Sequence, residues 1–150
     1  MSTKGLTPLA HGALNRCFGC GTENKTGLRL KFFIDEQQQI VCRIRLAQRF
    51  EGPPGHAHGG IIATLLDEAM SKANRLHGVT AMTRQMDVEY LRPVRLNHFY
   101  TLTGRRLSQD GRKNLCEAAI TDSTGTVLAR SKALFIAVDR TKLAQFAVKR

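Results

Sequence analysis

The feature that most constrains this chain is one long apolar stripe at helical spacing. Its members recur every three or four positions over about four turns: Ile62, Leu65, Leu66, Ala69, Met70, Ala73 and Leu76. This periodicity predicts an amphipathic helix that buries one face. Gly78 follows the stripe and is expected to end the helix. Because this is the only strong helix pattern in the chain, the fold has to be built around it.

The segments on both sides of this helix have the pattern of β-strands. Strands are predicted at residues 28–34, 40–46, 84–94, 98–107, 113–121 and 126–138. The turn-rich breaks at 108–111 and 122–125 suit hairpins. Antiparallel strands with one segregated helix define an α+β domain, and a long sheet wrapped around a central helix is the hotdog arrangement. The expected organisation is an N-terminal arm (1–26), a hotdog domain (27–140) and a loose or short helical tail (141–150).

Composition limits the class of protein. The chain has 150 residues with 42% hydrophobic content, enough for one ordinary core. No apolar run is long enough to cross a bilayer and no signal peptide is apparent, so a cytoplasmic protein with reduced thiols and no membrane partner is expected. The net charge of +11 predicts attraction to polyanions: nucleic acid, an anionic membrane or a phosphate-rich cofactor such as coenzyme A. The basic residues are scattered, however, which is equally typical of a solubilising surface.

The segment from Gly52 to Gly60 is rich in Gly and Pro and leads directly into the helix. The first backbone N–H groups of a helix are unpaired and lie at the positive end of its dipole. Such an end can hold a phosphate or a developing oxyanion. On this turn alone, N–H groups that simply bind water are the favoured interpretation.

The helix also carries a narrow face of small polar residues: Thr64, Asp67, Ser71 and Asn74. Such residues suit a second helix or a ligand close by, and Asp67 is the only charge among them. Glu68 better fits an ordinary solvated acid. His58 and Asp67 are nine residues apart, so about 13 Å separates them along a helix. Two antiparallel copies of the helix would bring the start of one beside Asp67 of the other, so a functional pairing predicts a homodimer.

The residues from Gly52 to Asp67, with His58-Gly59-Gly60 followed by an acid nine positions after the histidine, resemble the PaaI-like acyl-CoA thioesterases of the hotdog superfamily. The runs from Cys17 to Gly21 and from Met82 to Val94 also resemble that family. The resemblance covers roughly residues 17–138. It implies an acyl-CoA substrate and a homodimer, with a dimer of dimers (a homotetramer) as the expected assembly. One departure is Gly52, where some members carry an asparagine.

The resemblance also implies residue roles. The Gly59 N–H would polarise the thioester carbonyl while His58 shapes the turn. Asp67 of the partner subunit would be nucleophile or general base, and Thr83 would assist the attacking water. Residues expected to bind substrate are Gly60, Thr64, Arg84 and Arg92.

Weaker signals leave several alternatives open. Cys17 and Cys20 have the spacing of half a zinc site, to be completed by His11, Cys42 or Cys116, but a tight turn with two buried thiols is favoured. No metal or cofactor is therefore expected. Cys17 and His58 could form a nucleophile pair, but nothing in the sequence places them close together. Tyr90 is expected in the core or in an interface. The rival functions are a non-catalytic acyl-CoA sensor and a hotdog dehydratase; the absence of a helix-turn-helix segment argues against nucleic acid.

Overall fold

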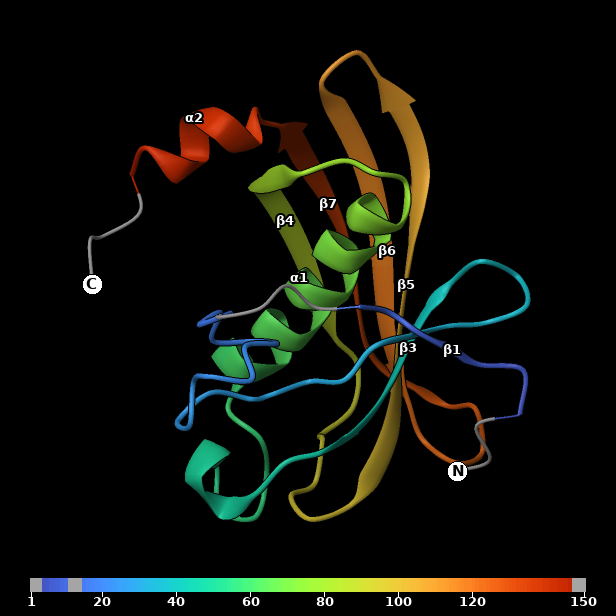
Figure 1. Cartoon of the computed structure of the whole chain (residues 1–150). Coiled ribbons are helices and arrows are strands. Elements are labelled where there is room, and N and C mark those ends of the chain that lie inside the picture. Colours follow the sequence, from blue (N-terminus) through green and yellow to red (C-terminus); the bar gives the residue numbers. More distant parts are fainter. Residues whose placement is uncertain (1–3, 11–14, 147–150) are drawn as a thin grey trace.

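A seven-stranded antiparallel sheet and one long helix build the protein (Figure 1). The structure, a computed structural model, describes residues 4–10 and 15–146. The sheet order is β1-β2-β3-β5-β6-β7-β4. The strands are β1 (Thr7–Pro8), β2 (Phe33–Ile34), β3 (Ile40–Arg45), β4 (Ala81–Tyr90), β5 (Phe99–Asp110), β6 (Lys113–Thr121) and β7 (Val127–Ala137). The helices are the 3₁₀ turn η1 (Gln48–Phe50), α1 (Gly59–Leu76) and α2 (Arg140–Ala144). The predicted α+β arrangement, a sheet around one central helix, is confirmed.

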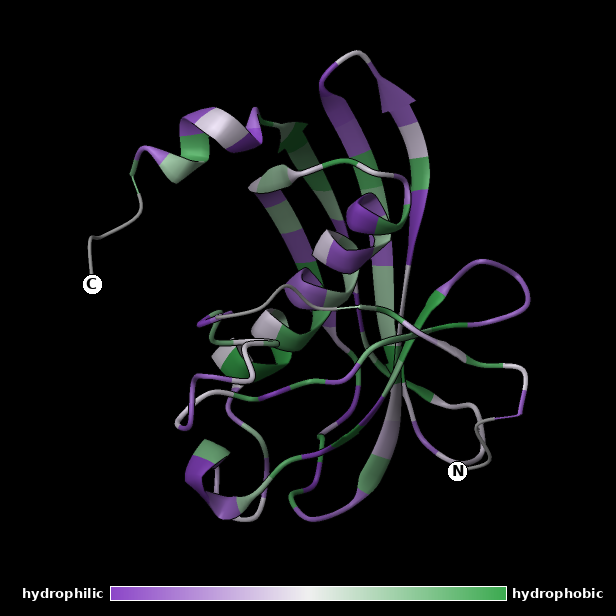
Figure 2. Ribbon diagram, in the orientation of Figure 1, coloured by the Kyte–Doolittle hydropathy of each residue, from purple (hydrophilic) through white to green (hydrophobic). Residues whose placement is uncertain are grey.

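The core lies between α1 and the sheet. Six of the seven residues of the apolar stripe are buried, and Leu76 is partly buried. Strand β6 alternates strictly, and its buried members are Asn114, Cys116, Ala118 and Ile120. Alternating hydropathy bands are visible on the strands behind α1 in Figure 2. The apolar residues that recur every 3.6 positions on the helix therefore pack against those that recur every 2 positions on the strands, and together they form one apolar layer.

Three predicted strands have clearly different bounds. The strand predicted at 98–107 continues as β5 to Asp110, into the break predicted at 108–111. Only Phe33–Ile34 of the run 28–34 joins the sheet, because Arg29 adopts a left-handed backbone (φ 53°) that interrupts the extended chain. The backbone N–H groups of Leu28 and Leu30 instead donate to Phe18 and Gly19, at 2.8 and 2.9 Å. The strand predicted at 84–94 starts earlier and ends at Tyr90, before Pro93 and its missing N–H donor.

The described part of the predicted arm packs on the domain. Thr7–Pro8 pairs with β2, and Cys20 lies in the core with 2% of its surface exposed. Residues 15–30 cross the side of α1 that faces away from the sheet (Figure 1), where Glu68 and Lys72 are buried. Helix α1 is thus covered on two sides. None of the helices in the described residues has the length and apolarity needed to span a bilayer.

Candidate active site

The start of α1 is organised by His58, which occupies the N-cap position. Its ring Nδ1 accepts a hydrogen bond from the Gly60 N–H at 2.9 Å, and its carbonyl accepts from Ile61 and Ile62 at 3.0 and 3.1 Å. The His58 ring thus caps the helix through Nδ1. His58 therefore satisfies two of the N–H groups that a helix leaves unpaired at its start, those of Gly60 and Ile61, and accepts the first regular helical bond from Ile62.

The remaining N–H of this first turn belongs to Gly59, and no described residue accepts a hydrogen bond from it. It lies at the positive end of an 18-residue helix. The Tyr90 hydroxyl donates to the Gly59 carbonyl at 3.0 Å, which ties the end of β4 to the start of α1. The structure thus leaves one backbone donor available for an anion or a developing oxyanion. Tyr90 is a site residue that sequence reasoning missed, because no pattern marks a contact across 31 residues.

Asp67 lies two turns further along α1 and is half-buried. Thr83, on the neighbouring strand β4, donates its hydroxyl to Asp67 Oδ1 at 2.5 Å. Burial raises the pKa of Asp67 above its ordinary value, the nearby Glu68 charge also raises it, and the Thr83 hydrogen bond opposes both. The result is a carboxylate that is more basic than usual and is fixed in orientation by a hydroxyl. Asp67 and Thr83 of one chain therefore lie side by side.

The Gly59 N–H and Asp67 do not meet within one chain. Helix α1 is continuous from Gly59 to Leu76, so the rise per residue separates the start of the helix from Asp67 by about 13 Å along the axis. A recess of about 560 Å³ is lined by outward-facing residues of the sheet such as Arg105, Glu117 and Lys132 and does not include Asp67. The candidate site is therefore defined by the hydrogen bonds at Gly59 and Asp67 and lies outside this recess.

The other predicted substrate residues are spread along α1 and β4. The Thr64 hydroxyl donates to the Gly60 carbonyl at 2.8 Å within the helix. Arg84 is exposed at the β-bulge next to Thr83, and Arg92 is exposed beyond the end of β4 near Asp122. Arg84 is thus adjacent to the Asp67–Thr83 pair, whereas Arg92 lies eight residues further along the chain.

The glycine that replaces the family asparagine has a steric reason in this loop. A Cβ atom added to Gly52 would lie 2.7 Å from the Cα of His58. No side chain fits there unless the backbone shifts, so an asparagine is incompatible with this loop. A water-holding amide at this position is excluded by the local packing as well as by the sequence.

Two predictions about α1 were wrong. Asn74 is buried on the sheet side, where its Oδ1 accepts from the Cys116 thiol, so the small polar face is shorter than predicted. Glu68 is 8% exposed and is no solvated acid. Burial alone would raise the pKa of Glu68, but Lys72, 2.9 Å away, and two thiols lower it below its ordinary value. Helical spacing could not reveal either placement, because Asn74 is buried by a contact with Cys116 of β6 and Glu68 by the N-terminal segment on the outer side of α1.

The two N-terminal cysteines lie over Glu68. A hydrogen bond from the Cys20 thiol lowers the pKa of Cys17 to about 6, while the pKa of Cys20 is strongly raised, chiefly by the same bond. Cys42 and Cys116 are buried elsewhere, where burial raises the pKa of each thiol to about 12 and about 11. Neither can complete a site with Cys17 and Cys20, and His11 lies outside the described residues.

Comparison with known proteins gives concordant results. The family described as the thioesterase superfamily matches residues 54–133. Acyl-coenzyme A thioesterase THEM4 of Rattus norvegicus is 29% identical over 113 residues, which cover 74% of this chain and 48% of that protein. The chain therefore spans about half the length of this curated relative.

Solved structures share the fold. A thioesterase superfamily protein is 30% identical with a TM-score of 0.78, covering 87% of this chain and 69% of that one. A hypothetical thioesterase from Streptococcus pneumoniae TIGR4, solved with coenzyme A, is 21% identical with a TM-score of 0.64, covering 67% of this chain and 81% of that one. The second likeness concerns the fold alone.

Proposed function

This chain belongs to the thioesterase superfamily, and from that premise we propose that it hydrolyses acyl-coenzyme A thioesters. One water is consumed, and the products are a free carboxylic acid and coenzyme A. The observation that carries the proposal is the Gly59 N–H, which His58 leaves as the one unbonded donor of the first helical turn among the described residues. The name of the rat relative supports the substrate class.

In the proposed mechanism, the Gly59 N–H donates to the thioester carbonyl oxygen. As the carbonyl carbon becomes tetrahedral, negative charge develops on that oxygen, and the helix dipole stabilises it. One donor of this kind typically contributes about 2.7–4 kcal/mol to transition-state stabilisation. The thiolate of coenzyme A then leaves with the electrons of the C–S bond and takes up a proton. No metal or redox cofactor is needed for these steps.

Asp67 of the partner subunit is the proposed base or nucleophile at the same carbonyl. Its raised pKa makes the carboxylate a stronger base, and Thr83 fixes one of its oxygens. A second feature supports this pair: the S. pneumoniae thioesterase was also solved with an aspartate and, separately, a threonine replaced by alanine. Those two positions are 16 residues apart, as are Asp67 and Thr83.

A homodimer is proposed because the two groups are too far apart along one helix. Strand β4 is an edge of the sheet, paired only with β7, and its exposed residues include Met82 and Tyr90. Exposed edges of this length are usually covered by another strand or chain. Two antiparallel copies of α1, separated by small residues such as Thr64 and Ser71, would form two equivalent sites. A dimer of dimers is the expected larger assembly, and native mass measurement tests it.

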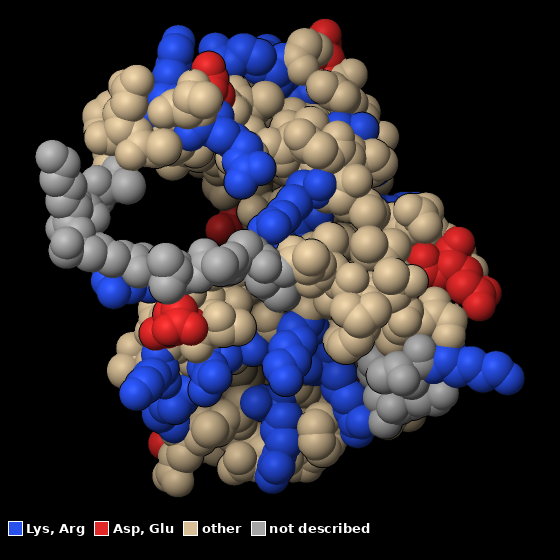
Figure 3. Space-filling model, viewed as in Figure 1, with Lys and Arg blue, Asp and Glu red and all other residues tan. Residues whose placement is uncertain are grey.

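The basic surface is the proposed site for the nucleotide phosphates of coenzyme A. Figure 3 shows Lys and Arg over much of one face, with few acidic residues among them. Arg84 is the proposed phosphate-binding residue nearest to Asp67 and Thr83, and its exposure at the bulge beside Thr83 supports this role. Guanidinium groups suit phosphate oxygens because they donate two parallel hydrogen bonds.

The test is thiol release from a panel of acyl-CoAs of different acyl length. We expect turnover by the wild type and a loss of about 10²–10⁴-fold in Asp67→Asn, whose fold is checked by circular dichroism. Asparagine has the same shape but cannot act as a base or a nucleophile. Activity within threefold of wild type in folded Asp67→Asn protein would remove Asp67 from the mechanism.

A further inference from the structure

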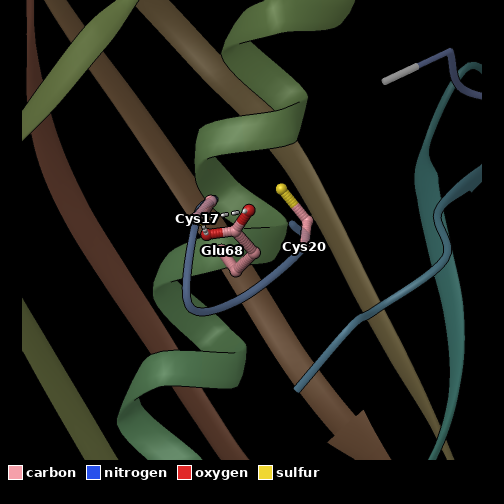
Figure 4. A group of neighbouring side chains, drawn as sticks. All are labelled: Cys17, Cys20 and Glu68. Carbon is pink, nitrogen blue, oxygen red and sulfur yellow. Dashed lines mark hydrogen bonds between the residues drawn. The ribbon is translucent and has the colours of Figure 1, made fainter. Parts of the chain in front are cut away.

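The strongest unassigned cluster lies on the outer side of α1, one residue after Asp67. Cys17 and Cys20 belong to one loop, and Glu68 rises from α1 between them (Figure 4). One ligand atom of each residue lies within 4.8 Å of the other two. The Cys17 sulfur lies 3.6 and 3.7 Å from the two carboxylate oxygens.

We propose that Cys17, Cys20 and Glu68 bind a zinc ion that fastens the N-terminal loop to helix α1. Zinc takes Cys sulfur at about 2.3 Å and carboxylate oxygen at about 2.0 Å in a tetrahedral arrangement, which places two such ligand atoms about 3.5 Å apart. The sulfur-to-oxygen separations of 3.6 and 3.7 Å are therefore close to those of two ligands of one ion. Two thiolates with one carboxylate favour zinc over calcium or magnesium, which prefer oxygen.

The loop is shaped to hold two sulfurs against the helix. Asn15 donates its side-chain N–H to the Cys20 sulfur at 3.3 Å, and its carbonyl oxygen accepts from the Cys17 N–H at 3.0 Å. Asn15 thus holds both the Cys20 sulfur and the Cys17 backbone, as hydrogen-bonding groups behind a metal site orient its ligands. A Cβ atom at Gly19 would lie 2.7 Å from the Glu68 carboxylate, so a larger residue would displace the carboxylate from its place beside the loop.

Lys72 balances the charge of the proposed site. Its ammonium is 2.9 Å from Glu68 Oε1, and both side chains are about nine-tenths buried. The net charge of the site is zero when it holds two thiolates, one carboxylate, one ammonium and Zn²⁺. The free-energy cost of a net charge among partly buried groups is therefore avoided. Lys72 would bind the carboxylate oxygen that the ion does not use. The lysine is therefore compatible with a bound cation and orients the third ligand.

The fourth position is open to solvent. Among the described residues no fourth Cys, His, Asp or Glu joins the cluster, and Cys17 is exposed. A water completes the tetrahedron, and the ion can enter from this side. The site is structural in our proposal, because Asp67 contacts Thr83 of β4 rather than this loop. The inference does not depend on the proposed thioesterase activity.

The first experiment measures zinc in the full-length protein. Protein purified under reducing conditions from zinc-supplemented cells should contain about one zinc per chain by mass spectrometry of the metal. Cobalt(II) added to metal-free protein should give thiolate-to-cobalt charge-transfer absorption. X-ray absorption of the zinc form should show two sulfur ligands at about 2.3 Å. Less than about a tenth of an equivalent, even after zinc is added to reduced protein, overturns the proposal.

Variants then locate the ion. Cys17→Ser and Glu68→Gln should each weaken zinc binding at least about tenfold, whereas Cys42→Ala, which removes a buried thiol outside the cluster, should leave it unchanged. If Cys17→Ser fails to fold, Glu68→Gln gives the same readout because it changes one charge and no volume. Full zinc content in both variants would place the ion elsewhere. A mass two hydrogens lower, with no zinc, would show instead that the thiols form a disulfide, and would equally overturn the proposal.

Discussion

Mixing two inactive variants should restore activity if each active site combines Gly59 of one chain with Asp67 of the other. The variants are Asp67→Asn and Gly59→Pro. Proline removes the Gly59 N–H, and the local structure accepts it: His58 precedes it at φ −63°, ψ 136°, the conformation that proline requires of its neighbour. Proline is also well tolerated at the first position of a helix, and an added Cβ meets only the Tyr90 ring, at 3.6 Å or more.

The expected magnitude follows from the geometry of a two-fold dimer. In a fully exchanged equal mixture, half of the dimers are mixed, and each mixed dimer has one intact site and one site with both lesions. About a quarter of wild-type activity should return. Each variant alone should retain about 1% or less, because loss of one oxyanion donor costs 10²–10³ in kcat and loss of the base a similar factor. The recovery is therefore at least about 25-fold over the starting proteins.

The assay is thiol release after subunit exchange, which is followed by native mass spectrometry of differently tagged chains. Gly59→Ala is the matched control, since it adds a Cβ but keeps the N–H, and it should remain active by itself. No recovery in a demonstrably exchanged mixture of folded variants would mean that both groups act within one chain. The shared-site proposal would then be refuted.

Three further predictions concern the same site. Thr83→Val should lower turnover less than Asp67→Asn does. The acid limb of the profile of kcat/KM against pH should move to higher pH, because the lost hydrogen bond had lowered the pKa of Asp67. Thr83→Ser should restore both turnover and profile, and an acid limb that stays in place in Thr83→Val would exclude a role of Thr83 in tuning Asp67. Tyr90→Phe should reduce kcat by about two- to tenfold, the size of one neutral hydrogen bond, with little change in KM; wild-type kcat would show that the contact is incidental. The affinity for coenzyme A should fall as the salt concentration rises, since exposed charges are screened over about 10 Å at 0.1 M. Calorimetry at several ionic strengths measures this affinity. A constant affinity would show that the positive charge of the protein does not bind the phosphates of coenzyme A.

The helix and most strands could be read from periodicity, because burial of one face imposes it. The stripe from Ile62 to Leu76 corresponds to α1 within a few residues, and the strand predicted at 113–121 coincides with β6. Where the prediction failed, as at residues 28–34, a left-handed Arg29 and pairing with Phe18 and Gly19 decided the outcome. Those contacts lie outside any local window, so alternation alone could not predict them.

The sequence by itself determined the central helix, the antiparallel strands and the pairing of a glycine-rich helix start with an acid nine residues later. These features are local in the sequence. The number of residues between two positions on a helix fixes the distance between them along its axis, because the rise per residue is constant. Only the tertiary structure decided which polar residues meet. It brought Thr83 to Asp67, tied Tyr90 to Gly59, and buried Glu68 under two cysteines from a segment 51 residues away in the chain. Each of these contacts joins separate elements, so it depends on how α1 packs between the sheet and the N-terminal segment and not on spacing along the chain.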